Sequence, residues 1–256
     1  MTKETVLSVR KLKTKYKVET TNNQYSFSEE TIIKYSIFKG KIIDRAEFEL
    51  IQAEEIRNNL MNKAINYLSY QARSINEVRR YLNDRDCSYE LADEIIEKIK
   101  NLGYLDDEVL ANSLYDYVVR SKKGPKFLEE KLISKGVDED IIRVTINNYT
   151  NVVEEEVLDN LLENILNRYK SYPKKKQKNL IYQKLLRDGF SSDVIGSKLN
   201  KTKFIDESNQ ELEKDLKKLL NKYDQLDYKI RSKIISKLIN KGYEYPNIIE
   251  CLENIE

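Results

Sequence analysis

Two adjacent carboxylates come closest to a catalytic pair in this sequence. Asp106 and Asp107 follow Gly103, and paired carboxylates can hold Mg²⁺ or act as general acid and base in metal-dependent hydrolysis. However, the pair stands just before Val109 and Leu110, where acidic residues cap a helix and stabilise its N-terminus. No third carboxylate stands at a convincing spacing. We therefore interpret both as helix-capping residues, with a metal-dependent hydrolase as the weaker alternative.

Other catalytic chemistry lacks the residues that it needs. The 256-residue chain contains no histidine, and its two cysteines, Cys87 and Cys251, stand far apart. They cannot complete a zinc site, and neither a Gly-x-Ser-x-Gly motif nor a glycine-rich phosphate loop is present. We expect no catalytic, metal-binding or cofactor-binding residues, so binding becomes the leading class of function. The two cysteines fit a reducing cytoplasm, and the short apolar runs predict neither a membrane span nor a signal peptide.

Basic residues form the sharpest charge feature. Eight bases without an acid lie between Arg168 and Arg187, although the whole chain has a net charge of only +2. A solvated surface is the ordinary interpretation of such a run. Bases also stand at equivalent places in two other segments, which favours a basic ridge that follows a phosphate backbone or an acidic partner. The predicted ridge consists of Arg73, Arg79, Arg80, Lys122, Lys123, Lys126, Lys174, Lys175, Lys176 and Lys178.

The elements that position these residues are mostly helical. Seven glycines and three prolines are too few turn-forming residues for an all-β fold. Residues 1–27 are the exception, because the alternation of Tyr16, Val18 and Thr20 before a polar break predicts a small β-hairpin. A short helix that ends at Gly40 and a second helix that begins at Asp44 are expected to follow.

From about residue 60 the sequence repeats with a period near 50. Each repeat has an anchor leucine: Leu82, Leu132, Leu185 and Leu238. Four positions later stands a residue that can end a helix: Asp86, Gly136, Gly189 and Gly242. With an amphipathic stretch before each anchor helix, the pattern predicts a mainly α fold of four stacked three-helix repeats. The predicted divisions are 1–59 for the hairpin and short helices, and 60–106, 107–153, 154–205 and 206–256 for the repeats.

Motifs in the first two repeats stand in a specific order. They are Tyr67-Leu68-Ser69-Tyr70, Arg73-Ser74, Glu77-Val78-Arg79, Tyr81-Leu82, Gly103-Tyr104-Leu105-Asp106-Asp107 and Ser121-Lys122-Lys123-Gly124-Pro125-Lys126. In this order the chain resembles the RecX family of bacterial recombination regulators. The hairpin-bearing N-terminus and the long C-terminal part look like the longer members from Gram-positive bacteria.

The resemblance implies a non-enzymatic protein that binds the RecA recombinase and its filament on DNA. Such a protein lies along the filament groove and restrains ATP hydrolysis and strand exchange, which regulates recombination and DNA repair. The resemblance also implies weak contact with single- or double-stranded DNA, and we expect a cytoplasmic monomer that does not bind membranes. A helical-repeat DNA-binding or adaptor protein that acts without RecA is the alternative, and steep salt dependence of DNA binding by the protein alone would distinguish it.

Overall fold

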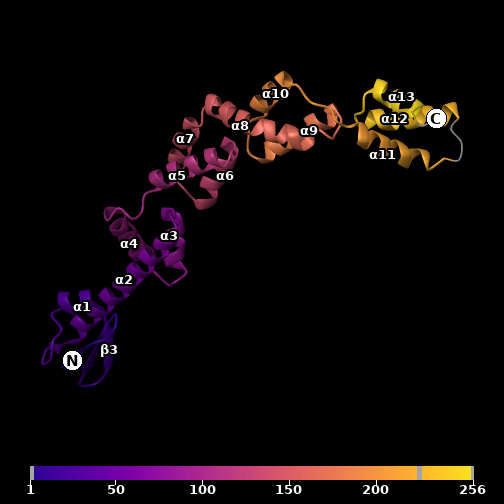
Figure 1. Ribbon diagram of the computed structural model, residues 1–256. Coiled ribbons are helices and arrows are strands. Elements are labelled where there is room, and N and C mark those ends of the chain that lie inside the picture. The colour runs from indigo at the N-terminus through magenta and orange to yellow at the C-terminus, as the bar shows by residue number, and fades with distance from the viewer. Residues whose placement is uncertain (1–2, 224–226, 255–256) are drawn as a thin grey trace. The chain divides into compact units, whose positions relative to one another are not determined.

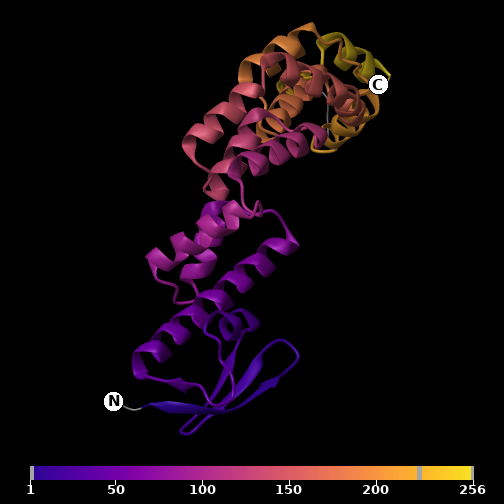
Figure 2. The ribbon, with the colours of Figure 1, turned by 90° about the vertical axis from the view of Figure 1, so that its left-hand side faces the viewer.

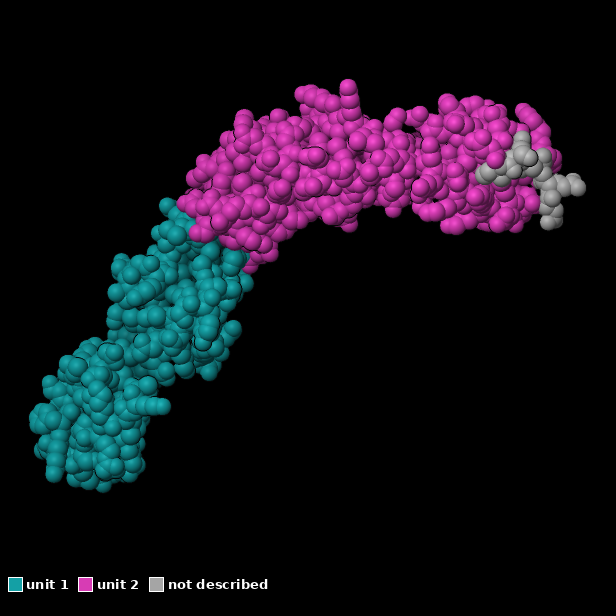
Figure 3. Space-filling view, in the orientation of Figure 1, with its two compact units in different colours: residues 1–110, 135–138 teal, residues 111–134, 139–256 magenta. Residues whose placement is uncertain are grey.

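The computed structural model describes residues 3–223 and 227–254. The chain divides into two compact units, residues 1–110 with 135–138 (unit 1) and residues 111–134 with 139–256 (unit 2), as Figure 3 shows. The described residues form thirteen helices and one small sheet; Figure 1 shows how they follow along the chain. The predicted mainly α fold with a β region at its N-terminus is confirmed. No helix within the described ranges has the length and apolar character to span a membrane.

The N-terminal part of unit 1 contains a four-stranded antiparallel sheet. Its strands lie in the order β3 (Gln24–Phe27), β2 (Tyr16–Thr20), β1 (Glu4–Lys11) and β4 (Ile42–Ile43). The hairpin predicted across the polar break after Thr20 is present as β2 and β3, but the sheet is larger than predicted because β1 pairs with β2 and the short β4 pairs with β1. Figure 2 shows the strands together on one side of a long helix.

Helices α1 (Glu29–Lys34) and α2 (Arg45–Tyr70) pack on one face of this sheet. Ile51 of α2 is fully buried in a cluster with Val18 and Phe27 of the sheet. Ser28 and Asp44 cap the two helices, since each side chain accepts a hydrogen bond from a backbone N–H three residues later. The predicted helix start at Asp44 is therefore confirmed.

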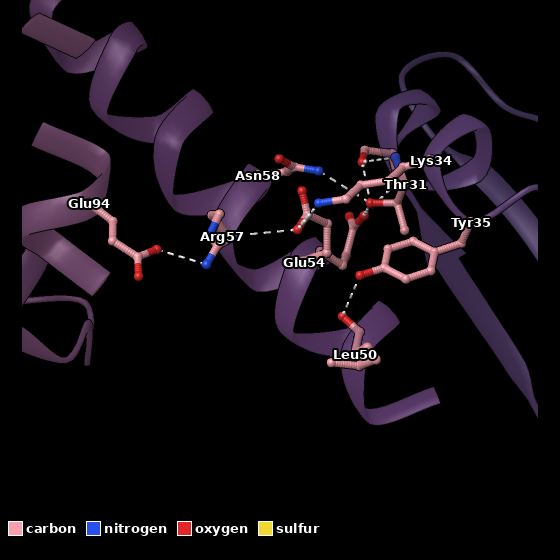
Figure 4. Close-up of polar contacts among 10 residues, drawn as sticks. Thr31, Lys34, Tyr35, Leu50, Glu54, Arg57, Asn58 and Glu94 are labelled. Carbon is pink, nitrogen blue, oxygen red and sulfur yellow. Dashed lines mark hydrogen bonds and ion pairs between the residues drawn. The ribbon is translucent and has the colours of Figure 1, made fainter. Parts of the chain in front are cut away.

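Polar contacts join α2 to its neighbours (Figure 4). Glu54 pairs with Lys34 at the end of α1, with 2.7 Å between carboxylate and ammonium. On its other side, α2 contacts α4 (Tyr89–Asn101), where Arg57 pairs with Glu94 at 2.7 Å. One helix thus belongs to both the sheet region and the first repeat.

The continuity of α2 differs from the sequence-based prediction. Separate short helices were expected in residues 1–59, followed by a first repeat that starts at residue 60. The division between 59 and 60 instead lies inside a 26-residue helix, because residues 45–70 contain no glycine or proline to interrupt it. The predicted division between 153 and 154 likewise lies just inside α8 (Asn151–Tyr169).

The remaining helices follow one another in sets of three. After the C-terminal part of α2, the first set continues with α3 (Ile75–Asn83) and α4, and the second is α5 (Asp107–Arg120), α6 (Pro125–Lys135) and α7 (Glu139–Asn148). The third consists of α8, α9 (Lys174–Arg187) and α10 (Ser192–Lys201), and the fourth of α11 (Asn209–Leu220), α12 (Tyr228–Asn240) and α13 (Tyr245–Glu253). The first, third and fourth sets each enclose an apolar cluster of their own.

The repeated sequence positions have repeated structural roles. The four anchor leucines are fully buried. The four residues predicted to end a helix all have a left-handed backbone, with φ of 58° at Asp86, 69° at Gly136, 88° at Gly189 and 100° at Gly242. The apolar residue that follows each of them is buried as well: Cys87, Val137, Phe190 and Tyr243. The predicted column of helix, stop and buried residue is confirmed in all four repeats.

The glycines at two of these stops also lie against the start of a helix from the preceding repeat. In unit 2, a β-carbon added to Gly189 would overlap the backbone of Phe127 in the first turn of α6. In unit 1, one added to Gly136 would overlap the side chain of Asn76 in the first turn of α3. No repeat precedes the first one, and there the equivalent position holds Asp86. A glycine is therefore used where the start of another helix must approach closely.

Candidate partner-binding surface

The corner between α5 and α6 carries three lysines of the predicted ridge. Lys122 ends α5 with a left-handed backbone (φ 54°), a position where glycine is usual, and its Nζ donates to the carbonyl of Asn160 at 2.9 Å. Lys123 pairs with Asp188 at 2.6 Å. Lys126 is exposed, and no carboxylate of the described residues pairs with it. The corner therefore uses one lysine in an ion pair and presents Lys126 to solvent.

Gly124 and Pro125 form a joint between the second and third repeats. The Gly124 N–H donates to the Asp188 carbonyl at 2.8 Å, and the Lys126 N–H donates to the Gly189 carbonyl at 3.0 Å. A β-carbon on Gly124 would overlap the Gly189 backbone. The Gly-Pro sequence thus starts α6 and holds Lys126 in a fixed place.

Asp188 is the electrostatic centre of this joint. Its two carboxylate oxygens pair with Lys123 at 2.6 Å and with Lys184 at 2.7 Å. Burial by itself raises the pKa of Asp188, but the two ammonium groups more than offset burial and hold the pKa below its ordinary value. The folded structure therefore favours the charged carboxylate.

We expect the contribution of Asp188 to stability to be lost in acid. Because its pKa is lowered on folding from about 3.8, the contribution is complete above about pH 5 and disappears as pH falls through the folded-state pKa. Asp188→Asn should lower the free energy of unfolding at pH 7 by about 1–3 kcal/mol, and this difference should shrink toward pH 2. Urea unfolding of both proteins across this range measures the difference. A difference that stays constant down to pH 2 would contradict the ion-pair account.

The corner between α8 and α9 carries the densest group of predicted bases: Lys174, Lys175, Lys176 and Lys178. Of these four lysines, only Lys174 has a carboxylate partner among the described residues. It pairs with Glu244 at 3.3 Å, and both side chains are about half exposed. Lys176 Nζ lies 4.4 Å from the centroid of the Tyr172 ring. Lys175 and Lys178 are exposed, and Lys178 donates to the side-chain oxygen of Asn200 at 2.7 Å. This corner therefore presents three positive charges that no described carboxylate neutralises.

One buried amide fixes the shape of this corner. Gln177 is fully buried, and the two hydrogens of its Nε2 are donated to the carbonyls of Tyr172 and Ile205 at 2.7 and 2.6 Å. The carbonyl of Lys170 lies 3.4 Å from the same nitrogen as a weak third contact. These carbonyls come from the segment before α9 and from the segment after α10. The backbone from which the lysines project is thereby held in place, which reduces the entropy lost when a partner binds. Tyr169 packs against the apolar cluster of the third repeat.

The three arginines of the predicted ridge, all in unit 1, are less available for binding. Arg73, between α2 and α3, pairs with Glu77 at 3.2 Å. Arg79 pairs with Asp93. Arg79 and Arg80 lie in α3 only three and two positions before the anchor Leu82. The predicted bases of the other two repeats lie six or more positions before their anchor leucines, so these two arginines do not stand at an equivalent place. Only Arg80 is exposed and without a carboxylate partner among the residues of the described ranges.

The ten predicted bases therefore fall into two groups. Four are in ion pairs: Arg73, Arg79, Lys123 and Lys174. Within the part of the chain that the structure describes, six have no carboxylate partner: Arg80, Lys122, Lys126, Lys175, Lys176 and Lys178. All but Arg80 belong to unit 2. The positive charge available to a partner is thus concentrated at two corners of unit 2.

The carboxylate pair Asp106 and Asp107 caps two different helices. Asp106 Oδ1 accepts from the N–H groups of Glu108 and Val109 at 2.8 and 3.0 Å, which caps α5. Asp107 is buried and its Oδ1 accepts from the N–H of Ile75 at 2.9 Å, in the first turn of α3. Burial raises the pKa of Asp107, and the hydrogen bond from Ile75 opposes this. The capping interpretation is confirmed, and the second helix that Asp107 caps was not foreseen.

Two features of unit 1 were not predicted from the sequence. The rings of Tyr67 and Tyr81 stack with centroids 4.1 Å apart, and the guanidinium groups of Arg73 and Arg85 lie 4.5 and 3.5 Å from these rings. The cation–π contact with Tyr67 is thus a second interaction of Arg73, beside its ion pair with Glu77. The second feature is a run of five bases from Arg10 to Lys17. It could have been recognised in the sequence, because no acidic residue interrupts it.

Comparison with known proteins agrees with this arrangement. Residues 61–98 match the first three-helix domain of RecX. Regulatory protein RecX of Staphylococcus aureus strain Newman is 32% identical over 234 residues, which cover 88% of this chain and 84% of that protein.

Two solved structures show the same fold. The crystal structure of RecX from Lactobacillus salivarius is 34% identical with a TM-score of 0.51, and the match covers 55% of this chain and 92% of that one. A crystal structure of regulatory protein RecX matches with a TM-score of 0.61 at 24% identity, over 75% of this chain and 96% of that one. The repeats, the ordered motifs and these relatives together place the chain in the RecX family of regulatory proteins.

Proposed function

We propose that this protein regulates homologous recombination and DNA repair by binding RecA and the filament that RecA forms on DNA. It lies along the filament groove and restrains ATP hydrolysis and strand exchange by occupying that groove, without catalysing a reaction. The observation that carries this proposal is the extensive similarity to a regulatory protein RecX, at 32% identity over 88% of the chain. We further propose that it acts in the cytoplasm as a monomer and contacts DNA only weakly.

The proposed contact surface is the pair of basic corners in unit 2. We use this name for the bases there that have no carboxylate partner among the described residues: Lys122, Lys126, Lys175, Lys176 and Lys178. They project from equivalent corners of consecutive repeats. A filament presents the same acidic groups and phosphates at regular intervals, so a chain with bases at repeated places can meet several of them at once. The repeats thus support recognition of a polymer better than recognition of a single small ligand.

Several weak contacts explain how such a surface can bind. Each exposed lysine contributes little by itself, but contacts on one chain add because the later ones form at high effective concentration. The joint between Gly124 and Gly189 fixes the spacing between the two corners, and Gln177 holds the backbone of the α8–α9 corner. Affinity then depends on the number of repeats that engage.

The ATPase activity of RecA tests the proposal. RecA hydrolysis of ATP, stimulated by single-stranded DNA, is titrated with this protein at physiological salt, beside a DNA-binding measurement without RecA. We expect suppression of hydrolysis well below one protein per RecA protomer, together with weak binding to free DNA. Unchanged hydrolysis and filament stability, with tight salt-sensitive binding to free DNA, would instead support a DNA-binding protein that acts without RecA.

A further inference from the structure

The hairpin of β1 and β2 is strongly basic. Five bases and no acid occur between residues 10 and 17: Arg10, Lys11, Lys13, Lys15 and Lys17. They lie at the end of β1, in the turn, and at the start of β2. The turn is closed by a hydrogen bond from the Leu12 N–H to the Lys15 carbonyl at 2.7 Å. The positive charge is therefore concentrated at the turn that joins β1 to β2 and at the strand ends beside it.

Nearby acids neutralise only part of this charge. Lys11 pairs with Glu29 of α1 at 3.3 Å, Lys15 with Glu55 of α2 at 2.9 Å, and Lys17 with Glu19 on the same strand at 3.3 Å. Arg10 and Lys13 are exposed, and neither has a carboxylate partner within residues 3–223 or 227–254. Two charges at this turn and beside it are thus open to a partner.

The strand register places like charges against each other. Arg10 lies directly opposite Lys17 in the β1–β2 ladder, and like charges at directly opposite positions destabilise a sheet. Their neighbours Val9 and Val18 are opposite each other and face the core, so Arg10 and Lys17 share the other face of the sheet. Glu19 on the same face pairs with Lys17 at 3.3 Å. Its pKa is lowered by the hydrogen bond from Ser8 and also by Lys17 and Arg10. One carboxylate thus offsets part of the repulsion between the two bases, and the charge that remains is open to an anion from another molecule.

We propose that the β1–β2 hairpin is a nucleic-acid-binding element whose bases contact backbone phosphates. β3 pairs with β2 as far as Tyr16, so only the turn between β1 and β2 projects beyond the three-stranded part of the sheet. Arg10 beside the turn and Lys13 within it are the exposed bases that would contact phosphates along the nucleic-acid backbone. Leu12 is 48% exposed at the turn, where its apolar side chain can contact base edges or sugars. This site lies in unit 1, apart from the basic corners of unit 2, and the proposal does not depend on RecA.

The test compares Arg10→Gln/Lys13→Gln with the native protein by fluorescence anisotropy on labelled duplex DNA and on labelled single strands, without RecA. Neither substitution removes an ion pair, and Arg10→Gln relieves the repulsion from Lys17, so the thermal midpoint should not fall. At 0.1 M salt we expect affinity for one or both nucleic acids to fall at least about tenfold. The slope of log K against log salt should become smaller by about 1.8 on duplex, or about 1.4 on single strands, because two phosphate contacts are lost.

The matched control is Arg45→Gln/Lys63→Gln, which removes one arginine and one lysine from exposed positions on α2 in the same unit. It should change affinity less than threefold. Equal effects of the two double variants would overturn the proposal, since net charge alone would then explain the loss. Unchanged nucleic-acid binding by Arg10→Gln/Lys13→Gln would overturn it as well. Binding to polyglutamate is measured in parallel, and a loss confined to polyglutamate would overturn the proposal and assign the hairpin to an acidic protein partner. None of these outcomes bears on the ATPase test of the proposed function.

Discussion

Gly189→Ala is expected to lower the free energy of unfolding of unit 2 by about 3 kcal/mol or more. The backbone at Gly189 has φ of 88°, and forcing an L-residue into the left-handed region costs roughly 1–2 kcal/mol. The new methyl group would also overlap the backbone of Phe127 at the start of α6. Backbone cannot move aside as a flexible side chain can, and such overpacking costs about another 1–3 kcal/mol. Urea unfolding followed by circular dichroism measures the loss.

Two further substitutions separate the causes. Gly124 does not have a left-handed backbone, but its β-carbon would overlap the Gly189 backbone. The loss in Gly124→Ala therefore measures the close approach of the two repeats alone. Gly196 lies inside α10 with no atom near its β-carbon position, so Gly196→Ala should stabilise the helix by about 0.5–1 kcal/mol. If Gly189→Ala and Gly124→Ala were as stable as the native protein, the joint between the second and third repeats would not exist as described.

The second large effect is expected from Lys174→Gln/Lys175→Gln/Lys176→Gln. This triple variant removes three charges from the α8–α9 corner and only one ion pair, between Lys174 and Glu244, whose partners are half exposed and contribute little to stability. Binding to the RecA filament at physiological salt should weaken by about tenfold or more. The slope of log K against log salt should become smaller by about 1.4, since Lys175 and Lys176 are the two replaced bases that belong to the basic corners and each phosphate contact on single-stranded DNA contributes about 0.7.

The matched control for this variant replaces Lys214, Lys217 and Lys218 by glutamine. These three lysines are exposed on α11 of the same unit, so net charge changes equally while the corner keeps its bases. We expect its affinity and its salt slope to remain close to those of the native protein. A salt slope that is unchanged in the Lys174–Lys176 variant would remove the basic corners from the account.

The repeated apolar columns made much of the fold predictable. Each anchor leucine is buried as expected. The local sequence determines both which residues lie on the inner face of a helix and where a left-handed residue ends that helix. The caps at Asp44 and Asp106 were predictable for the same reason. The small β4 was not, since a strand of two residues leaves no periodic signal and forms only because β1 lies beside it.

The availability of individual bases could not be predicted in the same way. Lys123 and Asp188 stand 65 positions apart, and they meet only because α6 begins against the end of α9. Arg79 and Asp93 are 14 positions apart on different helices. A charge pattern shows where bases occur, whereas tertiary packing decides which of them are neutralised. The like-charged pair Arg10 and Lys17 was not predicted either, because it depends on the register between β1 and β2.

The most direct test of the central claim is co-sedimentation with assembled RecA filaments. Native protein is mixed at physiological salt with RecA on single-stranded DNA, held by a slowly hydrolysed ATP analogue, and in parallel with the same DNA alone. The account predicts that the protein sediments with the filament much more than with DNA alone, and that the Lys174–Lys176 glutamine variant remains largely in the supernatant. Equal sedimentation with naked DNA and with the filament would contradict it.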